Sequence, residues 1–402
     1  MPNFNYPSMQ VSPATTLCET YTSERALNKA LRSVKNIFKK SAQTPSKKSS
    51  TQQRSKNSRT QKKELVFENL FNSSIKRQST ITVSGTQQKN ILDISERSAD
   101  YISTTYGRPI KSLGSGSDGA VSLYVHQDGG MYAIKTFFAT YKSKTNRNIS
   151  NIETTLESRV VHEIKMSNIL RHKYVSSIIE SIVLPDGSVH IVMDYYKNDL
   201  FTVVQEHQSN HSINSELYLN KLFYQLLVAI EYIHNQANVA HRDIKLDNIC
   251  VDFEGNLKLI DFGCASVFDP NMPTNTTGLA GSDPYIAPEV FEPNSIYDPS
   301  KVDIWAIGIV YLAMVSGRFP WEIAKSAERN YSIFLKDRSK IVDHWLPKLP
   351  SGSPSLEYNN VNAANELILA MLDINPDYRP TISQIKTSDF YKQLYSQFGE
   401  DF

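Results

Sequence analysis

The sequence of 402 residues contains only three cysteines and no long apolar run. Cys18, Cys250 and Cys264 show neither the spacing of disulfide pairs nor that of metal ligands, which favours a reducing compartment. The most apolar segment, Ile304 to Val315, is too short to cross a bilayer, which needs about 20 residues. The N-terminus lacks a charged region followed by an apolar run, so no signal peptide is expected. These absences predict a soluble, intracellular protein.

Acidic residues are scarce in the first hundred positions. Residues 1–100 hold 17 Lys and Arg against 7 Asp and Glu, whereas residues 101–402 hold 26 against 34. No Asp or Glu occurs from Arg25 to Lys63, and Ser, Thr, Gln, Asn and Lys are abundant. Such a segment buries too little apolar surface to offset the entropy of ordering, so residues 1–100 are predicted to be a disordered basic tail. A basic tail on an acidic domain points to an anionic partner.

One part of this tail, residues 24–40, has a helical pattern. Ser23 is a candidate N-cap, apolar residues from Leu27 to Phe38 recur at helical spacing, and the intervening residues are basic. A basic amphipathic helix of this kind suits an anionic membrane surface. The alternative is a solvated, phosphorylatable tail with a chance pattern. A role in nuclear import or nucleic-acid binding is less favoured, and no nucleic-acid partner is expected.

The stretch from Val239 to Gly263 combines the residue types that phosphoryl transfer requires. It contains His241-Arg242-Asp243, then Lys245 and Asn248, and then Asp261-Phe262-Gly263. Phosphoryl transfer needs an acceptor hydroxyl held in line, cations on the phosphates, and carboxylates that hold those cations. Each of these residues alone is most simply a surface or packing residue. Together, in this order and at this spacing, they resemble the catalytic loop and the metal-binding loop of eukaryotic protein kinases.

A glycine-rich segment and a lysine precede this stretch. Gly114, Gly116 and Gly119 have G-x-G-x-x-G spacing, which alone is weak evidence because dinucleotide-binding folds share it. The alternation from Val121 to Val125 predicts a strand after these glycines, and hence a glycine-rich hairpin rather than a helix. Lys135 ends the next apolar run and is predicted to contact the α- and β-phosphates of a nucleotide.

These motifs together resemble the eukaryotic protein kinases. The resemblance implies an α+β, bilobal fold over residues 101–396, with a small β-rich N-lobe (101–193), a hinge (194–199) and a larger helical C-lobe (200–396). It implies ATP and Mg²⁺ as cofactors and proteins with Ser or Thr acceptors as substrates. The activity expected is that of a non-specific serine/threonine protein kinase in the cytoplasm, with a peripheral location at the plasma membrane if the tail binds lipid.

The resemblance also assigns roles to individual residues. Asp243 would act as base and orient the acceptor hydroxyl, and Lys245 would neutralise the transferring phosphoryl group. Glu163 is the chosen ion-pair partner of Lys135, with Glu153 and Glu157 as alternatives. Asn248 and Asp261 supply oxygen ligands suited to Mg²⁺. The predicted nucleotide-binding residues are Gly114, Gly116, Gly119, Val121, Ala133, Lys135, Asp194, Tyr196, Asp199 and Cys250.

Residues 264–280 are predicted to form an activation segment. Thr274, Thr276 and Thr277 are candidate phosphorylation sites, and Arg242 would pair with the phosphate. Ser282 resembles the hydroxyl residue that contacts the catalytic Asp and Lys in Ser/Thr kinases. Three further residues are assigned structural roles: Glu289 would form a buried pair with Arg379, and Asp303 would anchor the catalytic loop.

The segments GSDPYIAPEVF and YDPSKVDIWAIGIVYLAMVSGRFPWEIA resemble the fungal nitrogen-permease-reactivator and halotolerance kinases. Members of that group regulate plasma-membrane nutrient and ion transporters, which the resemblance extends to this chain as an expectation. An alternative is a catalytically weak kinase fold that serves as a scaffold for transporter or ubiquitin-ligase partners. A small-molecule kinase is disfavoured by the placement of Lys245 and by the GSDPYIAPE segment.

Overall fold

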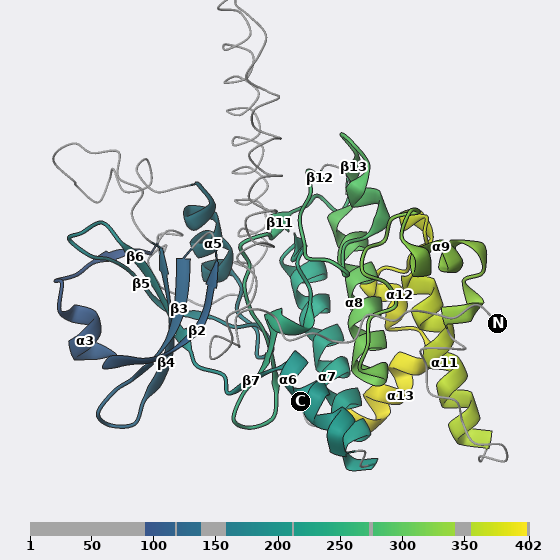
Figure 1. Cartoon of the computed structure of the whole chain (residues 1–402), viewed down its shortest axis with the longest axis horizontal. Helices are drawn as coiled ribbons and strands as arrows, with labels where there is room; N and C mark the ends of the chain where they lie inside the picture. Colours follow the sequence, from purple (N-terminus) through teal and green to yellow (C-terminus); the bar gives the residue numbers. More distant parts are fainter. Residues whose placement is uncertain are drawn as a thin grey trace, which may run out of the picture. The chain divides into compact units, whose positions relative to one another are not determined.

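The computed structural model describes residues 93–116, 119–137, 158–210, 213–272, 276–341 and 355–399 (Figure 1). All of these residues belong to one compact unit. The predicted helix at 24–40, the rest of the basic tail before residue 93, Glu153, Glu157 and Thr274 lie outside the described residues.

The first lobe is built on a six-stranded sheet with the order β1-β5-β6-β4-β3-β2. Its strands are β1 (Ser95–Glu96), β2 (Arg108–Gly116), β3 (Gly119–Val125), β4 (Met131–Phe137), β5 (Ile178–Val183) and β6 (Val189–Asp194). All neighbours pair antiparallel except β1, which runs parallel to β5. The short helix α3 (Tyr101–Thr105) and the longer α5 (Ser158–Ile169) complete this lobe.

Each face of the sheet contributes side chains to an apolar cluster, because successive strand residues point to opposite sides. One face packs on α5 through a cluster of Phe137, Val160, Ile164, Ile178, Val189 and Ile191. The other face packs on α3 and the turn after it through Ile102, Tyr106, Ile134, Ile182 and Val192. Ile178 and Ile182 of β5 reach opposite faces because a register shift between Ile178 and Glu180 reverses the alternation.

The segment before residue 101 is part of this lobe. Arg97 donates to Oε1 of Glu180 at 2.6 Å, and the hydroxyls of Tyr101 and Tyr106 donate to Oε2 at 3.0 and 2.8 Å. The predicted boundary at residue 101 is therefore too late, because β1 already pairs with β5 and the Glu180 carboxylate holds residues on both sides of the boundary. Residues 93–100 are mostly polar, so their composition did not predict these long-range contacts.

The second lobe is mainly helical. Its helices are α6 (Leu200–Asn210), α7 (Ile213–Glu231), α8 (Pro299–Ser316), α9 (Arg329–Lys336), α11 (Ser355–Met371), α12 (Ile382–Ile385) and α13 (Asp389–Phe398), with a π-helical turn η2 (Tyr232–Gln236) and 3₁₀ turns η3 (Leu246–Asn248), η4 (Pro288–Phe291) and η5 (Pro376–Tyr378). Helix α8 contacts α7, α6 and α11 and lies in the core of the lobe. It begins at the N-cap Asp298, whose side chain accepts from the Ser300 amide, and ends at Gly317, whose φ of 68° suits glycine. Among the described residues α8 is long and apolar enough to span a membrane, but 78% of it is buried inside the protein, as expected for a core helix.

Three small sheets position the loops of the second lobe. The first contains β7 (Asn198–Asp199), β9 (Ile249–Val251) and β10 (Leu257–Leu259). The second pairs β8 (Val239–Ala240) with β11 (Ser266–Val267), and the third pairs β12 (Thr276–Thr277) with β13 (Ile296–Tyr297). The connection between the lobes runs from Asp194, the last residue of β6, to Asn198, the first of β7. The α+β architecture with a β-rich first lobe and a helical second lobe confirms the predicted fold class.

Candidate active site

The loop after β8 is held by a buried carboxylate. Asp303 of α8 is fully buried and accepts from the backbone amides of His241 and Arg242, each at 2.7 Å. His234 lies 2.8 Å from the same carboxylate. Arg242 has a left-handed φ of 66°, a conformation that non-glycine residues rarely adopt and that these bonds maintain. Asp303 therefore anchors the loop, as the sequence predicted.

Asp243, Lys245 and Ser282 form a closed triangle. The Lys245 ammonium lies 3.1 Å from Oδ2 of Asp243 and donates to Oγ of Ser282 at 2.8 Å. The Ser282 hydroxyl in turn donates to Oδ1 of Asp243 at 2.9 Å. The predicted contact of Ser282 with the two loop residues is present. Because each oxygen of the Asp243 carboxylate has a partner, the orientation of this side chain is fixed.

Asn248 and Asp261 lie at the same centre. The amide nitrogen of Asn248 donates to the backbone oxygen of Asp243 at 2.9 Å and to its Oδ2 at 3.0 Å, which leaves the amide oxygen as the ligand atom. Asp261 has a φ of 61° and accepts from the Gly263 amide. Burial alone would raise the pKa of Asp261, but Lys135, the Gly263 amide, His241 and Lys245 outweigh it and hold the pKa below its usual value. The carboxylate is therefore ionised and suited to a cation.

Lys135 of β4 bridges the two lobes. Its ammonium lies 2.7 Å from Oε1 of Glu163 on α5 and 3.7 Å from Oδ1 of Asp261. The predicted ion pair between Lys135 and Glu163 is present, and both side chains are largely buried. On the same helix, His162 lies 2.7 Å from the backbone oxygen of Ala265, so α5 contacts the chain just after Asp261-Phe262-Gly263. No sequence pattern predicted this second contact.

The glycine-rich hairpin is formed by β2 and β3. Gly114 pairs with Val121 and Gly116 with Gly119, while residues 117 and 118 between them lie outside the described part. A Cβ on Gly114 would meet no atom within 4 Å, which agrees with an open face for a ligand. Gly119 differs, because a Cβ there would lie 2.1 Å from the Thr136 oxygen. The third glycine is thus also required for packing on β4.

The predicted nucleotide-binding residues lie on strands around this hairpin and at the junction of the lobes. Ala133 pairs with Met193 near the end of β6, which Asp194 closes, and Asp199 pairs with Cys250. Asp199 also accepts from the Thr202 amide at 2.7 Å, which ties it to the start of α6. Burial raises the pKa of the Cys250 thiol to about 12, so it is a packing group and not a reactive thiolate.

The hydroxyl of Tyr196 forms a hydrogen bond within the protein. The hydroxyl donates to Oγ of Ser176 at 3.2 Å, and burial raises its pKa to about 12. The side chain is therefore engaged with the segment before β5.

The candidate phosphorylation sites occupy a strand. Thr276 is buried, with 8% exposure, and pairs with Tyr297, while Thr277 pairs with Ile296. The Thr276 side chain is therefore not accessible in this conformation, and its phosphorylation stays a prediction. Arg242 donates to the Tyr297 hydroxyl at 2.9 Å and lies 3.5 Å from the Gly278 oxygen. Thr277 stays a prediction.

The predicted pair of Glu289 and Arg379 is confirmed as a bidentate contact. The two guanidinium nitrogens donate to the two carboxylate oxygens at 2.6 and 2.8 Å, and the Arg379 side chain is fully buried. The guanidinium also lies 4.8 Å from the Trp305 ring centre. This pair ties the segment after Ser282 to the C-terminal part of the lobe.

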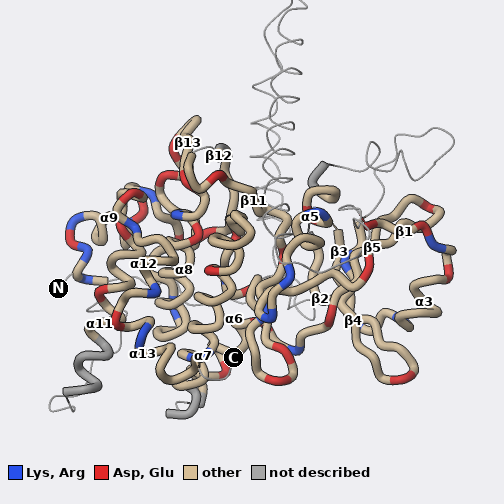
Figure 2. Tube along the Cα trace, turned by 180° about the vertical axis from the view of Figure 1, so that it is seen from behind, with Lys and Arg blue, Asp and Glu red and all other residues tan. Residues whose placement is uncertain are grey.

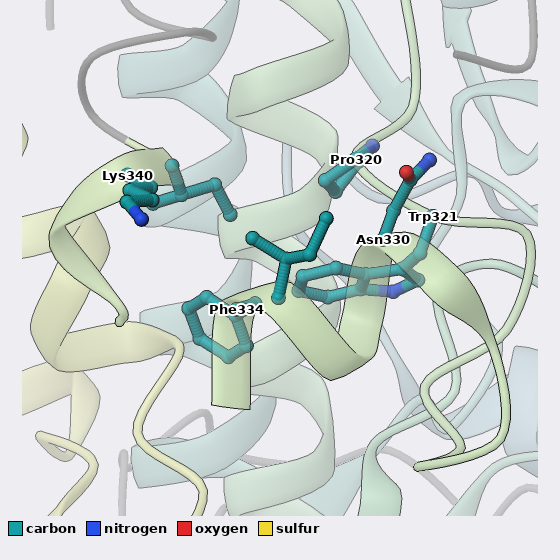
Figure 3. A pocket seen from close by; sticks show the side chains of 7 residues that line it. Pro320, Trp321, Asn330, Phe334 and Lys340 are labelled. Carbon is teal, nitrogen blue, oxygen red and sulfur yellow. The ribbon is translucent and has the colours of Figure 1, made fainter. Parts of the chain in front are cut away.

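Among the described residues no group of three or more His, Cys, Asp or Glu side chains could hold a metal ion. One carboxylate and one amide oxygen are nevertheless the donor set that suits Mg²⁺, which keeps some waters and takes other ligands from phosphates. A separate small, open hollow lies beside α9. Its walls include Trp321, Phe334 and Lys340 (Figure 3), and it contains no carboxylate or nucleophile, so it is not the catalytic centre.

Comparison with known sequences agrees with this geometry. The family described as "Protein kinase domain" matches residues 108–391. Probable serine/threonine-protein kinase RTK1 of Saccharomyces cerevisiae is 36% identical over 58% of this chain and 36% of the relative. Serine/threonine-protein kinase hal4 of Schizosaccharomyces pombe is 30% identical over 75% of this chain and 45% of the relative.

A third relative is the nitrogen permease reactivator protein of Saccharomyces cerevisiae, which is 29% identical over 70% of this chain and 38% of the relative. The chain thus spans less than half the length of these relatives. The matches confirm the resemblance to fungal kinases that the sequence motifs indicated.

Proposed function

The chain belongs to the protein kinase family, and from this premise we propose that it transfers the γ-phosphate of ATP to Ser or Thr hydroxyls of protein substrates. One observation carries the proposal: Asp243, Lys245, Asn248, Asp261 and the Lys135–Glu163 pair are brought to a single centre from both lobes. A family member that had lost its activity would be expected to lack part of this set.

The arrangement gives each side chain one task. Lys135, held by Glu163, would bind the nucleotide phosphates, and Asn248 and Asp261 would hold Mg²⁺. When bound, Mg²⁺ would neutralise charge on the phosphates. Asp243 orients the acceptor hydroxyl and takes its proton, while Lys245 faces the transferring group. The contact of Lys245 with Ser282 supports Ser/Thr acceptors, in line with the names of the relatives.

A phosphate-transfer assay with Mg·ATP and a generic protein substrate tests the proposal. We expect Asp243→Asn and Asp261→Asn to lower the rate by a factor of about 100 or more, because each removes a charge at the centre. Asp128→Asn is the matched control, since this carboxylate is 70% exposed in a turn. Equal phosphate incorporation by all variants would indicate contamination and would favour the scaffold alternative.

For the cellular role we propose regulation of plasma-membrane nutrient or ion transporters, with the basic tail at an anionic membrane surface and the protein otherwise in the cytoplasm. The excess of Lys and Arg in residues 1–100 and the similarity to the nitrogen permease reactivator protein support this. Sedimentation of the full chain with vesicles tests the membrane step. We expect binding to phosphatidylserine vesicles, no binding to phosphatidylcholine vesicles, and loss of binding when Arg32, Lys35 and Lys39 are replaced by Ala. Equal sedimentation of both proteins with both vesicles would remove the membrane step.

A further inference from the structure

We propose that Tyr297 is a positioning residue that orders the activation segment (residues 264–280) through Arg242, so that the segment needs no phosphate. The inference rests on the proposed kinase function for its effect on the reaction, but its structural part can be tested by itself. The sequence analysis predicted that Arg242 pairs with a phosphorylated threonine; in the structure Tyr297 is its partner instead.

The phenol of Tyr297 lies between a cation and the activation segment. Its single proton is donated to the Gly278 backbone oxygen at 2.6 Å, and its oxygen accepts from Nη2 of Arg242 at 2.9 Å. The Arg242 guanidinium also lies 5.9 Å from the centre of the Tyr297 ring. Both hydrogen-bonding functions of the hydroxyl are therefore used, and it links the catalytic loop to the segment.

The link acts where the chain changes direction. Thr276 and Thr277 of β12 pair with Tyr297 and Ile296 of β13, and β12 ends at Thr277, just before Gly278, which has a φ of 91°. Ser282, four residues later, contacts both Asp243 and Lys245. Fixing the Gly278 oxygen thus fixes the short span that ends on the catalytic triangle.

The charges around the link disfavour a phosphate there. Residues 269–300 contain five Asp or Glu and no Lys or Arg, and the trace near β12 and β13 carries acidic residues (Figure 2). None of the ion pairs found among the described residues involves Arg242, and its buried Nε has no hydrogen-bond partner there. A phosphate on this segment would add negative charge to a stretch that already carries five carboxylates and no Lys or Arg. The neutral Tyr297 hydroxyl accepts a hydrogen bond from the Arg242 guanidinium and adds no negative charge to the segment.

Tyr297→Phe removes the hydroxyl and keeps the ring, so it isolates the link. Tyr331→Phe is the matched control, because Tyr331 is equally buried, lies in α9, and has a hydroxyl with no hydrogen-bond partner among the described residues. Two measurements are made on the phosphatase-treated full chain with each variant. Hydrogen–deuterium exchange reports the amides of residues 276–282, and steady-state kinetics report kcat and KM for Mg·ATP and for a protein substrate.

We expect the wild type to be active with no phosphate found by mass spectrometry from Ser266 to Ser282. In Tyr297→Phe, exchange in residues 276–282 should rise about tenfold or more, and kcat/KM for the protein substrate should fall by a similar factor, since a hydrogen bond to a charged group is lost. KM for Mg·ATP should stay within about twofold, because other elements hold the nucleotide. Tyr331→Phe should match the wild type in both measurements.

Each other outcome is decisive. Unchanged exchange in Tyr297→Phe would overturn the inference, and so would raised exchange with unchanged kinetics or loss of wild-type activity on phosphatase treatment. Raised exchange in Tyr297→Phe with a wild type that shows no transfer before or after phosphatase treatment would support the link while refuting the proposed function.

Discussion

At the residue scale, Lys135 holds the catalytic centre together by its charge. Its ammonium lies within 3.7 Å of Asp261 and 2.7 Å of Glu163, and its side chain is 14% exposed. Two carboxylates therefore depend on one cation in a mostly buried place. Removing the cation would leave like charges near each other and raise the pKa of Asp261, which weakens its ability to hold a metal ion.

We expect Lys135→Met to lower kcat/KM for Mg·ATP by a factor of about 100 or more, because both the phosphate contact and the ion pair are lost. Steady-state kinetics at saturating protein substrate measure this. Lys392→Met, at an exposed lysine, is the control and should leave kcat/KM unchanged. Wild-type kinetics in Lys135→Met would mean that the lysine does not contact the nucleotide.

Arg379 depends in the same way on Glu289. Arg379→Met should lower the free energy of unfolding by about 3–5 kcal/mol, because it leaves the Glu289 carboxylate without its partner in a protected place. Urea denaturation measures this change. Lys386→Met, which breaks the more exposed pair with Glu231, should cost about 1 kcal/mol or less. The double variant Arg379→Met/Glu289→Leu also removes the unpaired carboxylate and should regain part of the lost stability. If it were no more stable than Arg379→Met, the unpaired charge of Glu289 would not explain the loss of stability.

At the element scale, the first lobe depends on a short N-terminal strand and helix. β1 lengthens the sheet beside β5, and α3 covers the face opposite α5. The Glu180 carboxylate accepts from Arg97, Tyr101 and Tyr106 and joins the two elements to β5. Burial and the hydrogen bond to Glu180 both raise the pKa of Tyr106, which agrees with a neutral, donating phenol.

A protein that begins at residue 101 should be less stable than one that begins at residue 93. The loss of β1 and of Arg97 removes one strand pairing and the two hydrogen bonds from Arg97 to Glu180, worth about 1–3 kcal/mol together. Thermal unfolding of the two proteins measures the difference. A midpoint that is the same for both would show that residues 93–100 add nothing to the lobe.

At the scale of the whole molecule, the partly buried His172 and the buried His190 make stability depend on pH. Burial, with Lys173 and Lys258 nearby, lowers the pKa of His172 to about 4, and its Nδ1 accepts from the Tyr174 amide. Burial also lowers the pKa of His190, whose two ring nitrogens contact Thr136 and Ser188. Both rings are neutral in the folded protein.

Because the unfolded state binds protons more readily, stability should fall as the pH drops from about 6.5 through the folded pKa of His172, near 4. After allowance for the partial exposure of His172, its share is about 1 kcal/mol at pH 5. Urea denaturation from pH 7.5 to 5 measures the slope. His172→Gln retains an acceptor and should flatten it, and a slope unchanged in that variant would contradict the assignment.

The catalytic loop and its partners could be predicted because the residues that carry the chemistry lie in short sequence motifs. Asp243, Lys245 and Asn248 lie within six residues, and the resemblance supplied Ser282, Glu163 and Arg379 as partners. Composition could not place the start of the lobe, because a short, mostly polar segment has the same composition whether or not it pairs with a strand. Gly119 fitted a phosphate-binding motif, and its second role against Thr136 could be seen only once β3 and β4 were paired.

The sequence by itself determined the fold class, the family and the residues of the catalytic centre, since motif spacing fixes which groups a loop presents. Only the tertiary structure decided what those groups touch across long separations. Arg242 meets Tyr297 across 55 positions and His162 meets Ala265 across 103. Such contacts depend on how helices and strands pack, and packing is a property of the folded chain that local sequence patterns do not carry.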